Sequence, residues 1–314
     1  MIKKLSYIVL PIAFCAIFIL FQCSQNMTSF KIYSSPVYIG DSLIGAIVTE
    51  YDYFSPRGDW GDAKYEDVKQ SLWIAEKKDP SNSRIIHLQS DLLEPPSVRM
   101  LLLPSGKIFY STLNRYEEPE IWVYDTMSME NTRFTNNSII CCASKTGKYI
   151  TVEDRQGDYY YLYEIDTKKI IKTYSNKNEP LMFAGDTAVI LRSIFEPYTI
   201  TVENLNTTQI DTLSNNLWLF PLKLTSWHDF ALVIINNYLY QLRIKNNMLD
   251  TIRLSLGVDD FPEYNFGWEG DIDDDMLHLL QTGHNKFDDN EGCLYEIMLS
   301  GEKSLKMYIC NEKK

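Results

Sequence analysis

Aromatic and arginine side chains gather in segments that the sequence predicts to be loops between strands. Aromatic rings offer a large contact area at a small entropic cost, and interspersed Arg groups add hydrogen bonds, a combination that suits sugar rings or a protein partner. For any single residue, a simpler interpretation is that the ring packs its loop against the neighbouring strands. As a group they predict a ligand-binding surface, which comprises Tyr53, Arg57, Trp60, Tyr65, Arg115, Tyr116, Arg155 and Tyr159.

Residues able to support catalysis or to bind a metal occur without the spacing that known motifs require. The sequence contains no H-E-x-x-H pair, G-x-S-x-G elbow, P-loop or dinucleotide fingerprint. His228-Asp229 and His284 can serve acid-base chemistry only if the fold brings them into a common pocket. The alternating aspartates of residues 271–275 resemble the start of a calcium loop, but Met276 stands where that loop needs glycine. We therefore predict no metal and no cofactor, and leave catalysis open.

The cysteines suggest one disulfide and one buried pair. If residues 301–302 form the two-residue turn of the last hairpin, Cys293 and Cys310 lie opposite each other, because their numbers sum to the 603 that this register requires. A disulfide there would fasten the last strand in an oxidising compartment, whereas the alternative is two small apolar side chains packed in the sheet. Cys141-Cys142 are adjacent in a predicted buried strand, so we expect them on opposite faces, packed in the core.

The N-terminus has the features of a targeting segment. Lys3 and Lys4 precede an apolar run over residues 5–21, and Leu20 stands three positions before Cys23. This pattern resembles a bacterial lipoprotein signal, which implies cleavage before Cys23 and transfer of lipid onto it. The alternative is an uncleaved N-terminal membrane anchor. Both interpretations place the rest of the chain outside the cytoplasm.

The charge of the chain argues against nucleic-acid binding. Removing residues 1–22 deletes two lysines, so 28 basic and 42 acidic residues remain and the formal charge changes from −12 to −14. Binding to phosphate groups needs a positive surface. We therefore exclude nucleic acid as a partner.

One hairpin pattern recurs along almost the whole chain and must position the predicted loops. In residues 160–175, apolar and polar residues alternate, a polar turn follows, and a β-branched strand returns. Similar segments start at Ser71, Glu120, Thr199, Leu239 and Cys293. When Asp125, Asp166, Asn206, Lys245 and Ser300 are aligned at the junction of strand and turn, the spacings are 41, 40, 39 and 55 residues. A repeat of this length built from short strands is typical of a β-propeller blade.

Two glycine turns strengthen this prediction. The segments PSGK, residues 104–107, and KTGKY, residues 145–149, lie where the two inner strands of a blade would meet. They resemble the x-DGK-x turns of TolB-like periplasmic propellers. The resemblance covers about residues 37–310 and implies a six-bladed fold, but it carries no catalytic residue over to this chain.

These observations predict an all-β, six-bladed propeller of four-stranded antiparallel blades. We expect a signal peptide at 1–22, a lipid-anchored tether at 23–36 with one possible strand, and the propeller at 37–314, with a long first-blade insert at 52–70. The expected function is a non-enzymatic binding or scaffold lipoprotein in the inner or outer membrane of a Gram-negative bacterium. It would present its loops, in the periplasm or at the cell surface, to an envelope protein or glycan. The alternative is a propeller enzyme, a glycan lyase or hydrolase, with polar residues converging at the mouth of the central channel.

Overall fold

The computed structural model describes most of the chain as β-structure. The described residues are 26–39, 42–55, 64–76, 78–92, 99–113, 118–154, 156–245, 248–257, 269–273, 276–281, 293–298 and 306–309. All regular elements within them are strands, as the sequence predicts. Among these residues we find no helix with the length and hydropathy needed to cross a membrane.

The strands form sheets of consecutive chain segments. The first sheet contains β1 (Asn26–Ile39), β2 (Leu43–Ser55), β3 (Lys64–Glu76) and β4 (Asp79–Leu92). The second contains β5 (Met100–Leu102), β6 (Lys107–Leu113), β7 (Pro119–Asp125) and β8 (Asn131–Asn136). The third contains β9 (Ser138–Ala143), β10 (Tyr149–Asp154), β11 (Tyr159–Glu164) and β12 (Lys169–Ser175). The fourth contains β13 (Asn178–Ala184), β14 (Ala188–Ser193), β15 (Ile200–Asn204) and β16 (Ile210–Ser214).

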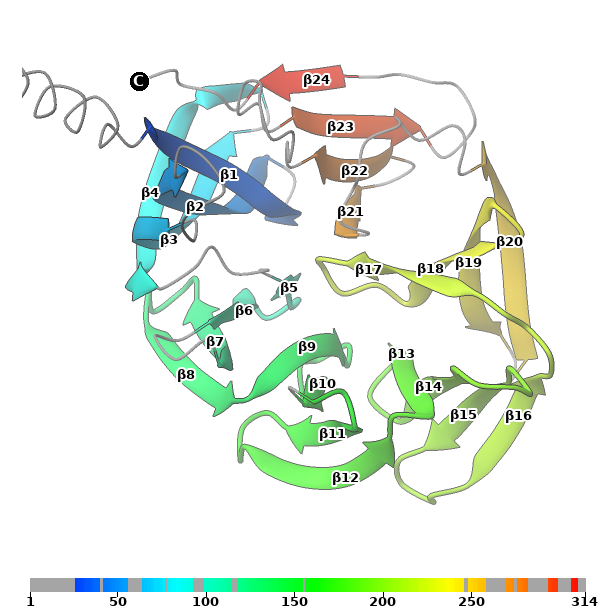
Figure 1. Ribbon diagram of the computed structural model, residues 1–314. Coiled ribbons are helices and arrows are strands. Elements are labelled where there is room, and N and C mark those ends of the chain that lie inside the picture. Colours follow the sequence, from blue (N-terminus) through cyan, green and yellow to red (C-terminus); the bar gives the residue numbers. More distant parts are fainter. Residues whose placement is uncertain are drawn as a thin grey trace, which may run out of the picture.

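The last sheet has eight strands and consists of two four-stranded antiparallel halves. One half contains β17 (Phe220–Leu224), β18 (Phe230–Ile235), β19 (Tyr238–Lys245) and β20 (Met248–Gly257). The other contains β21 (Glu269–Asp273), β22 (Met276–Gln281), β23 (Cys293–Met298) and β24 (Lys306–Ile309). A short parallel pairing of β17 with β21 joins the halves. The sheets lie around a common centre with their first strands innermost, which is the arrangement of a β-propeller (Figure 1).

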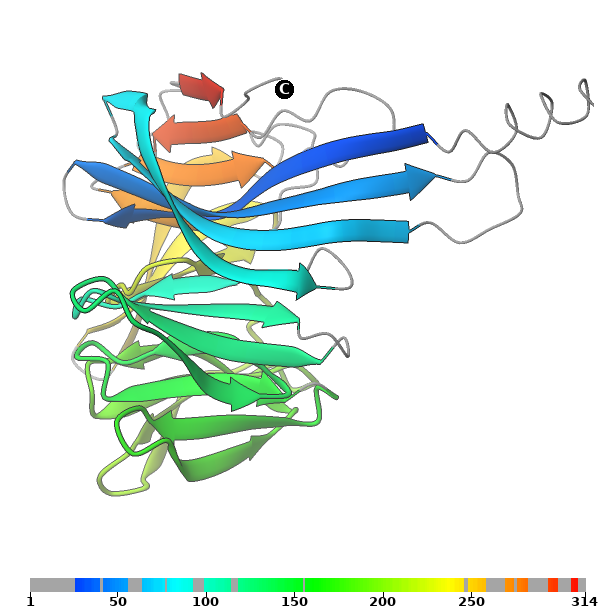
Figure 2. The same ribbon diagram turned by 90° about the vertical axis from the view of Figure 1, so that its left-hand side faces the viewer.

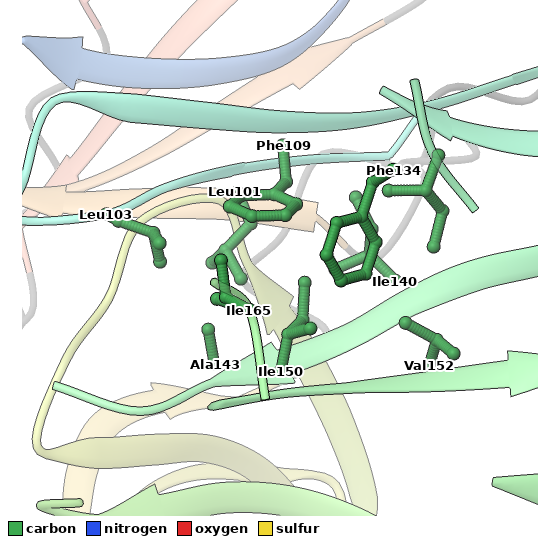
Figure 3. Close-up of a cluster of buried hydrophobic side chains, with 10 residues drawn as sticks. Leu101, Leu103, Phe109, Phe134, Ile140, Ala143, Ile150, Val152 and Ile165 are labelled. Atoms are coloured by element: carbon green, nitrogen blue, oxygen red, sulfur yellow. The ribbon is translucent and has the colours of Figure 1, made fainter. Parts of the chain in front are cut away.

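The core lies between neighbouring sheets, and alternating residues of one strand serve two different boundaries. In β6, Ile108 and Tyr110 pack with the first sheet, whereas Phe109 between them packs toward the third (Figure 3). Successive side chains of a strand point to opposite faces, so a strand buried on both sides is apolar at every position. Burying one side chain such as that of Phe109 stabilises the fold by about 1.5–3 kcal/mol.

The predicted glycine turns are present at the predicted places. Gly106 lies between β5 and β6 with φ +79°, and Gly147 lies between β9 and β10 with φ +73°. Both values fall in the left-handed region that favours glycine. At Gly147 there is a second constraint, because a Cβ atom there would lie 2.8 Å from Leu103 Cδ1.

The repeat is also present, with a corrected alignment. In the turns after β7, β11 and β15, a residue of positive φ stands four positions after Asp125, Glu164 and Asn204, so these three residues are equivalent. The alignment of Asp125 with Asp166 and Asn206 was therefore wrong by two residues. Polar residues occupy several positions of each turn, which is why composition alone misplaced the junction.

The first sheet is longer than the sequence predicts. β1 pairs with β2 from Asn26 onward, so residues 26–36 belong to a strand where a tether was expected. β2 and β3 pair up to Phe54 and Lys64, which confines the predicted insert to the connection between them. The outer parts of β1, β2 and β3, residues 26–34, 48–55 and 64–70, project beyond the other sheets (Figure 2), and we call them the extension.

The turn between β17 and β18 reaches across the centre of the ring to β5. The N–H of Leu102 donates to the carbonyl of Thr225 at 2.8 Å, and the N–H of Trp227 donates to the carbonyl of Leu102 at 3.0 Å. In Figure 1, β17 correspondingly points into the ring toward β5. Main-chain hydrogen bonds therefore link the second sheet directly to the last one.

Candidate functional site

Three of the eight predicted ligand-binding residues lie in the described part of the chain. They are Tyr53 in β2, Tyr65 in β3 and Tyr159 at the start of β11. The other five lie outside the described residues: Arg57, Trp60, Arg115, Tyr116 and Arg155. Tyr53, Tyr65 and Tyr159 belong to the side of the ring on which second strands end and third strands begin, and we call this side the loop face.

Tyr53 and Tyr65 pack within the extension. The Tyr65 ring centre lies 5.5 Å from that of Tyr53 and 5.5 Å from that of Tyr51. Tyr51 and Val68 are buried beside them. Burial, and then the neighbouring Tyr65 and Tyr53, raise the pKa of Tyr51 to about 12. These rings form a small core that stiffens the three strands, which is the packing interpretation of their role.

Tyr159 is exposed and ends a row of aromatic rings. Its side chain is 47% exposed and stacks on Tyr161 with ring centres 6.5 Å apart. Tyr161 meets Tyr163 edge to face at 6.4 Å, and Tyr163 contacts Phe134 at 5.5 Å. The row follows the boundary between the second and third sheets. Tyr159 thus offers a ring to solvent, while Tyr161 and Tyr163 are partly buried packing residues.

An aromatic pocket that the sequence analysis did not identify opens on the loop face. Its cavity has a volume of about 170 Å³ and lies between the β14–β15 connection and the segment that leads into β17. Trp218 is 54% and Phe220 49% exposed, with ring centres 4.4 Å apart, and Tyr198 lies 6.4 Å from Trp218. The remaining lining residues are Arg192, Ser193, Ile194, Leu217 and Leu219.

An ion pair forms the polar wall of this pocket. Arg192 Nε donates to Glu179 Oε2 at 2.6 Å, and an Arg192 Nη group donates to the carbonyl of Leu219. Both side chains of the pair are largely buried. Arg192 therefore fixes the segment that carries Trp218 against the fourth sheet, and Glu179 connects the pocket to the central channel.

The central channel contains a smaller cavity of about 60 Å³. Arg99, Glu153, Glu179 and His228 all line it. The Arg99 guanidinium donates to the carbonyls of Ile140 and Cys141, so it holds β9 in place. The Nε2 atom of His228 lies 2.8 Å from Ser226 Oγ. The volume suffices for a few water molecules and is far below the several hundred Å³ of typical small-molecule sites.

Cys141 and Cys142 both line this cavity, contrary to the expectation that they point to opposite faces. The pairing of β9 with β10 shifts between Thr151 and Val152, so β9 bulges at this point. A bulge breaks the two-residue alternation on which the expectation depended. Burial raises the pKa of both thiols, that of Cys142 to about 12, so they remain protonated and are poor metal ligands. Across the described part of the chain, no three His, Cys, Asp or Glu side chains are grouped as metal ligands.

The predicted disulfide falls at the edge of the described residues. Cys293 is paired with Ile309, one residue away from the predicted register, and Cys310 lies outside the described residues. The disulfide remains a prediction. Of the other acid-base candidates, His228 lines the channel cavity. His284 lies outside the described residues.

Comparison with known proteins defines the fold. No protein family and no curated protein matches this sequence. The β-propeller domain of the trilobed protease from Pyrococcus furiosus is similar in structure, with a TM-score of 0.50, 14% identity, and coverage of 85% of this chain and 82% of that chain.

Two further structures are similar. An acylaminoacyl peptidase from Pyrococcus horikoshii has a TM-score of 0.51 and 12% identity, and the match covers 86% of this chain but 52% of the peptidase, so this chain spans about half its length. TolB from Acinetobacter baumannii has a TM-score of 0.49 and 13% identity, with coverage of 90% of this chain and 79% of that chain. At such identities the likeness to the two Pyrococcus structures shows the fold, a β-propeller, and assigns no residue a function.

Proposed function

We propose that the protein is a six-bladed propeller lipoprotein of the cell envelope that binds a glycan through its loop face. The four four-stranded sheets and the two halves of the eight-stranded sheet support a count of six blades. The N-terminal signal pattern supports removal of residues 1–22 and a lipid on Cys23. The protein has no catalytic role in this proposal.

The observation that carries the proposal is the aromatic pocket. Exposed Trp218 and Phe220, with Tyr198 beside them, present rings on which the apolar face of a sugar can stack. Arg192 and Ser193 line the same cavity and supply polar groups for hydroxyls at its edge. The cavity of about 170 Å³ suits one sugar unit at the end of a chain better than an extended segment.

The proposal is tested with residues 24–314, by screening an array of bacterial glycans and then measuring affinity by calorimetry. Trp218→Ala should weaken binding about 10-fold, equivalent to about 1.4 kcal/mol. Tyr238→Ala is the matched control, because Tyr238 is also an exposed loop-face ring but does not line the pocket, and it should leave affinity unchanged. Equal affinity of Trp218→Ala and the unmodified protein would refute the proposal. If the protein binds no glycan but captures another protein, and Trp218→Ala abolishes that capture, the ligand of the pocket is a protein and not a glycan.

One observation favours the alternative function, a propeller enzyme that acts on glycans. Arg99, Glu153, Glu179 and His228 converge on one cavity, as a propeller enzyme acting on glycans would require. Two facts favour binding instead: Arg99 donates to main-chain carbonyls, and Glu179 is paired with Arg192. Incubating the bound glycan with the protein and with Glu153→Gln distinguishes the functions, because cleavage that only the unmodified protein performs would establish the enzyme.

A further inference from the structure

We propose that the loop face is turned toward the membrane that holds Cys23, so that the glycan bound by the aromatic pocket belongs to a molecule of that same membrane. This inference rests on the proposed function and adds to it the orientation of the propeller and the location of its ligand. Three observations carry it: the position of the extension, the place where β1 begins, and the length and stiffness of the three strands.

The tip of the extension and the aromatic pocket lie on the same face of the ring. β2 ends at Ser55 and β3 begins at Lys64, which is the connection from second to third strand in the first sheet. The pocket is built on the corresponding connection of the fourth sheet, between β14 and β15, and on the segment that leads from β16 into β17. In a propeller of consecutive antiparallel strands, these connections all lie on one side.

The chain enters the propeller at the tip of the extension. Asn26, the first residue of β1, pairs with Ser55, the last residue of β2. Only two residues lie between Cys23 and Asn26, so the two can be at most about 10 Å apart. A lipid on Cys23 therefore holds the tip of the extension at the membrane surface, whereas the tether expected from the sequence would have left the propeller free to turn.

The extension is long and is stiffened by contacts between its strands, so it can keep the propeller at a fixed distance from the membrane. β2 has 13 residues, against 7 in β6 and 6 in β10, although each begins just after the turn from its first strand. The additional length amounts to about 20 Å at ~3.3 Å per residue. The Tyr51, Tyr53 and Tyr65 rings pack together, and Lys31 Nζ lies 3.6 Å from Glu50 Oε1 across the first two strands. These contacts make the extension a spacer and leave room for a membrane-attached headgroup below the pocket.

The charges in the described part of the extension do not orient the propeller. The described charged residues of the extension are of both signs, so it lacks the basic cluster that attracts anionic lipid. They are Lys31, Glu50, Asp52, Lys64, Glu66, Asp67 and Lys69. The orientation follows from the position of the anchor and the stiffness of the strands.

The orientation is tested with residues 24–314 tethered to phosphatidylcholine vesicles through an N-terminal His tag and a nickel-chelating lipid, which makes the test independent of native lipidation. A fluorophore is placed at Phe195 or at Thr207, two exposed positions at opposite ends of the fourth sheet. Energy transfer to acceptor-labelled headgroups should be stronger from position 195. A long flexible Gly-Ser linker before Asn26 is the control and should abolish the difference. Equal transfer without the linker, or stronger transfer from position 207, would overturn the proposal.

The ligand's location is tested on the same vesicles, with and without the glycolipid fraction of the native membrane. Glycolipid in the tethering vesicle should slow imidazole-induced release of the unmodified protein but not of Trp218→Ala. The proposal would be overturned if glycolipid in the tethering vesicle left the release rate unchanged while separate glycolipid vesicles bound to the tethered protein. That result would place the ligand on an opposing membrane surface. Metabolic labelling of the full chain with a fatty-acid analogue, compared with Cys23→Ala, tests lipidation separately. Because glycan affinity, orientation and lipidation are measured independently, a failure of the proposed function is distinguishable from a wrong orientation.

Discussion

Lys172 and Glu203 form an ion pair across the boundary between the third and fourth sheets. The Glu203 side chain is 1% exposed, whereas that of Lys172 is 34% exposed. Lys172 Nζ also lies 5.3 Å from the centre of the Tyr174 ring. Burial and the nearby Glu203 carboxylate raise the pKa of Tyr174, so its hydroxyl stays protonated. A buried carboxylate in this boundary thus depends on one partly exposed lysine for its counter-charge.

Replacing that lysine should destabilise the protein. Lys172→Met keeps an apolar stem of similar length but leaves the Glu203 charge buried without its partner. Removing one member of a buried pair costs about 3–5 kcal/mol, and we expect about 2–3 kcal/mol here because Lys172 reaches solvent. The free energy of unfolding in urea measures the loss. The double variant Lys172→Met, Glu203→Met should recover most of it, and no recovery would show that the buried charge is not its cause.

A second contact between the same sheets predicts a dependence on pH. Asp186 Oδ1 accepts hydrogen bonds from Thr146, at 2.9 Å from its main-chain nitrogen and 3.0 Å from its hydroxyl. Burial acts to raise the pKa of Asp186, but hydrogen bonds from Thr146 and Ser144 outweigh it and hold that pKa below its ordinary value. A lowered folded-state pKa stabilises the protein above the unfolded-state value of about 3.9, and this contribution is lost as the pH falls through the folded-state pKa.

Asp186→Asn should therefore be less stable than the unmodified protein at pH 7, by about 1 kcal/mol. Below about pH 4 the difference should shrink, because protonation removes the same charge from the unmodified protein. Urea unfolding curves of both proteins at pH 7 and in the acid range provide the comparison. A difference that stays constant with pH would contradict the role given to the Asp186 charge.

Two glycine turns form a matched pair that separates the cost of a positive φ from the cost of a steric clash with an added Cβ atom. Gly147 has φ +73° and an added Cβ would meet Leu103 at 2.8 Å, whereas Gly185 has φ +65° and nothing within 4 Å of an added Cβ. Gly185→Ala should lower the free energy of unfolding by about 1 kcal/mol through backbone strain alone. Gly147→Ala should lower it by about 2–3 kcal/mol, since buried Leu103 must also move. Equal losses would mean that Leu103 yields without strain.

Features encoded within a short segment were predictable from the sequence. Alternating polarity and the glycines of residues 104–107 and 145–149 located the hairpins, because a turn and its two strands are neighbours along the chain. The repeat near 40 residues then indicated a propeller. The strand expected within residues 23–36 is longer than the sequence indicated, because residues 26–36 are largely polar and their strand depends on pairing with β2.

Features that depend on contacts between distant segments were not predictable. The bulge that turns Cys141 and Cys142 toward one cavity arises from the pairing of β9 with β10, which the sequence of β9 does not reveal. From the sequence alone, Trp218 and Phe220 are indistinguishable from ordinary residues of an inner strand. Their pocket exists because Arg192 binds the carbonyl of Leu219 and brings that segment beside the β14–β15 connection.

The crossing from the last sheet to β5 predicts unusual protection from hydrogen exchange. Turns at strand ends normally exchange quickly, as we expect for residues 185–187 between β13 and β14, the corresponding turn of the fourth sheet. Residues 225–229 also connect two strands, but the N–H groups of Trp227 and Leu102 are held in main-chain hydrogen bonds of 3.0 and 2.8 Å across the ring. Hydrogen exchange resolved by residue should therefore be markedly slower at the amides of Trp227 and Leu102 than at those of residues 185–187. Equal rates would mean that the crossing opens readily. The crossing connects a first to a second strand and so lies on the side opposite the loop face. Protection would show that it stays closed across the ring in solution.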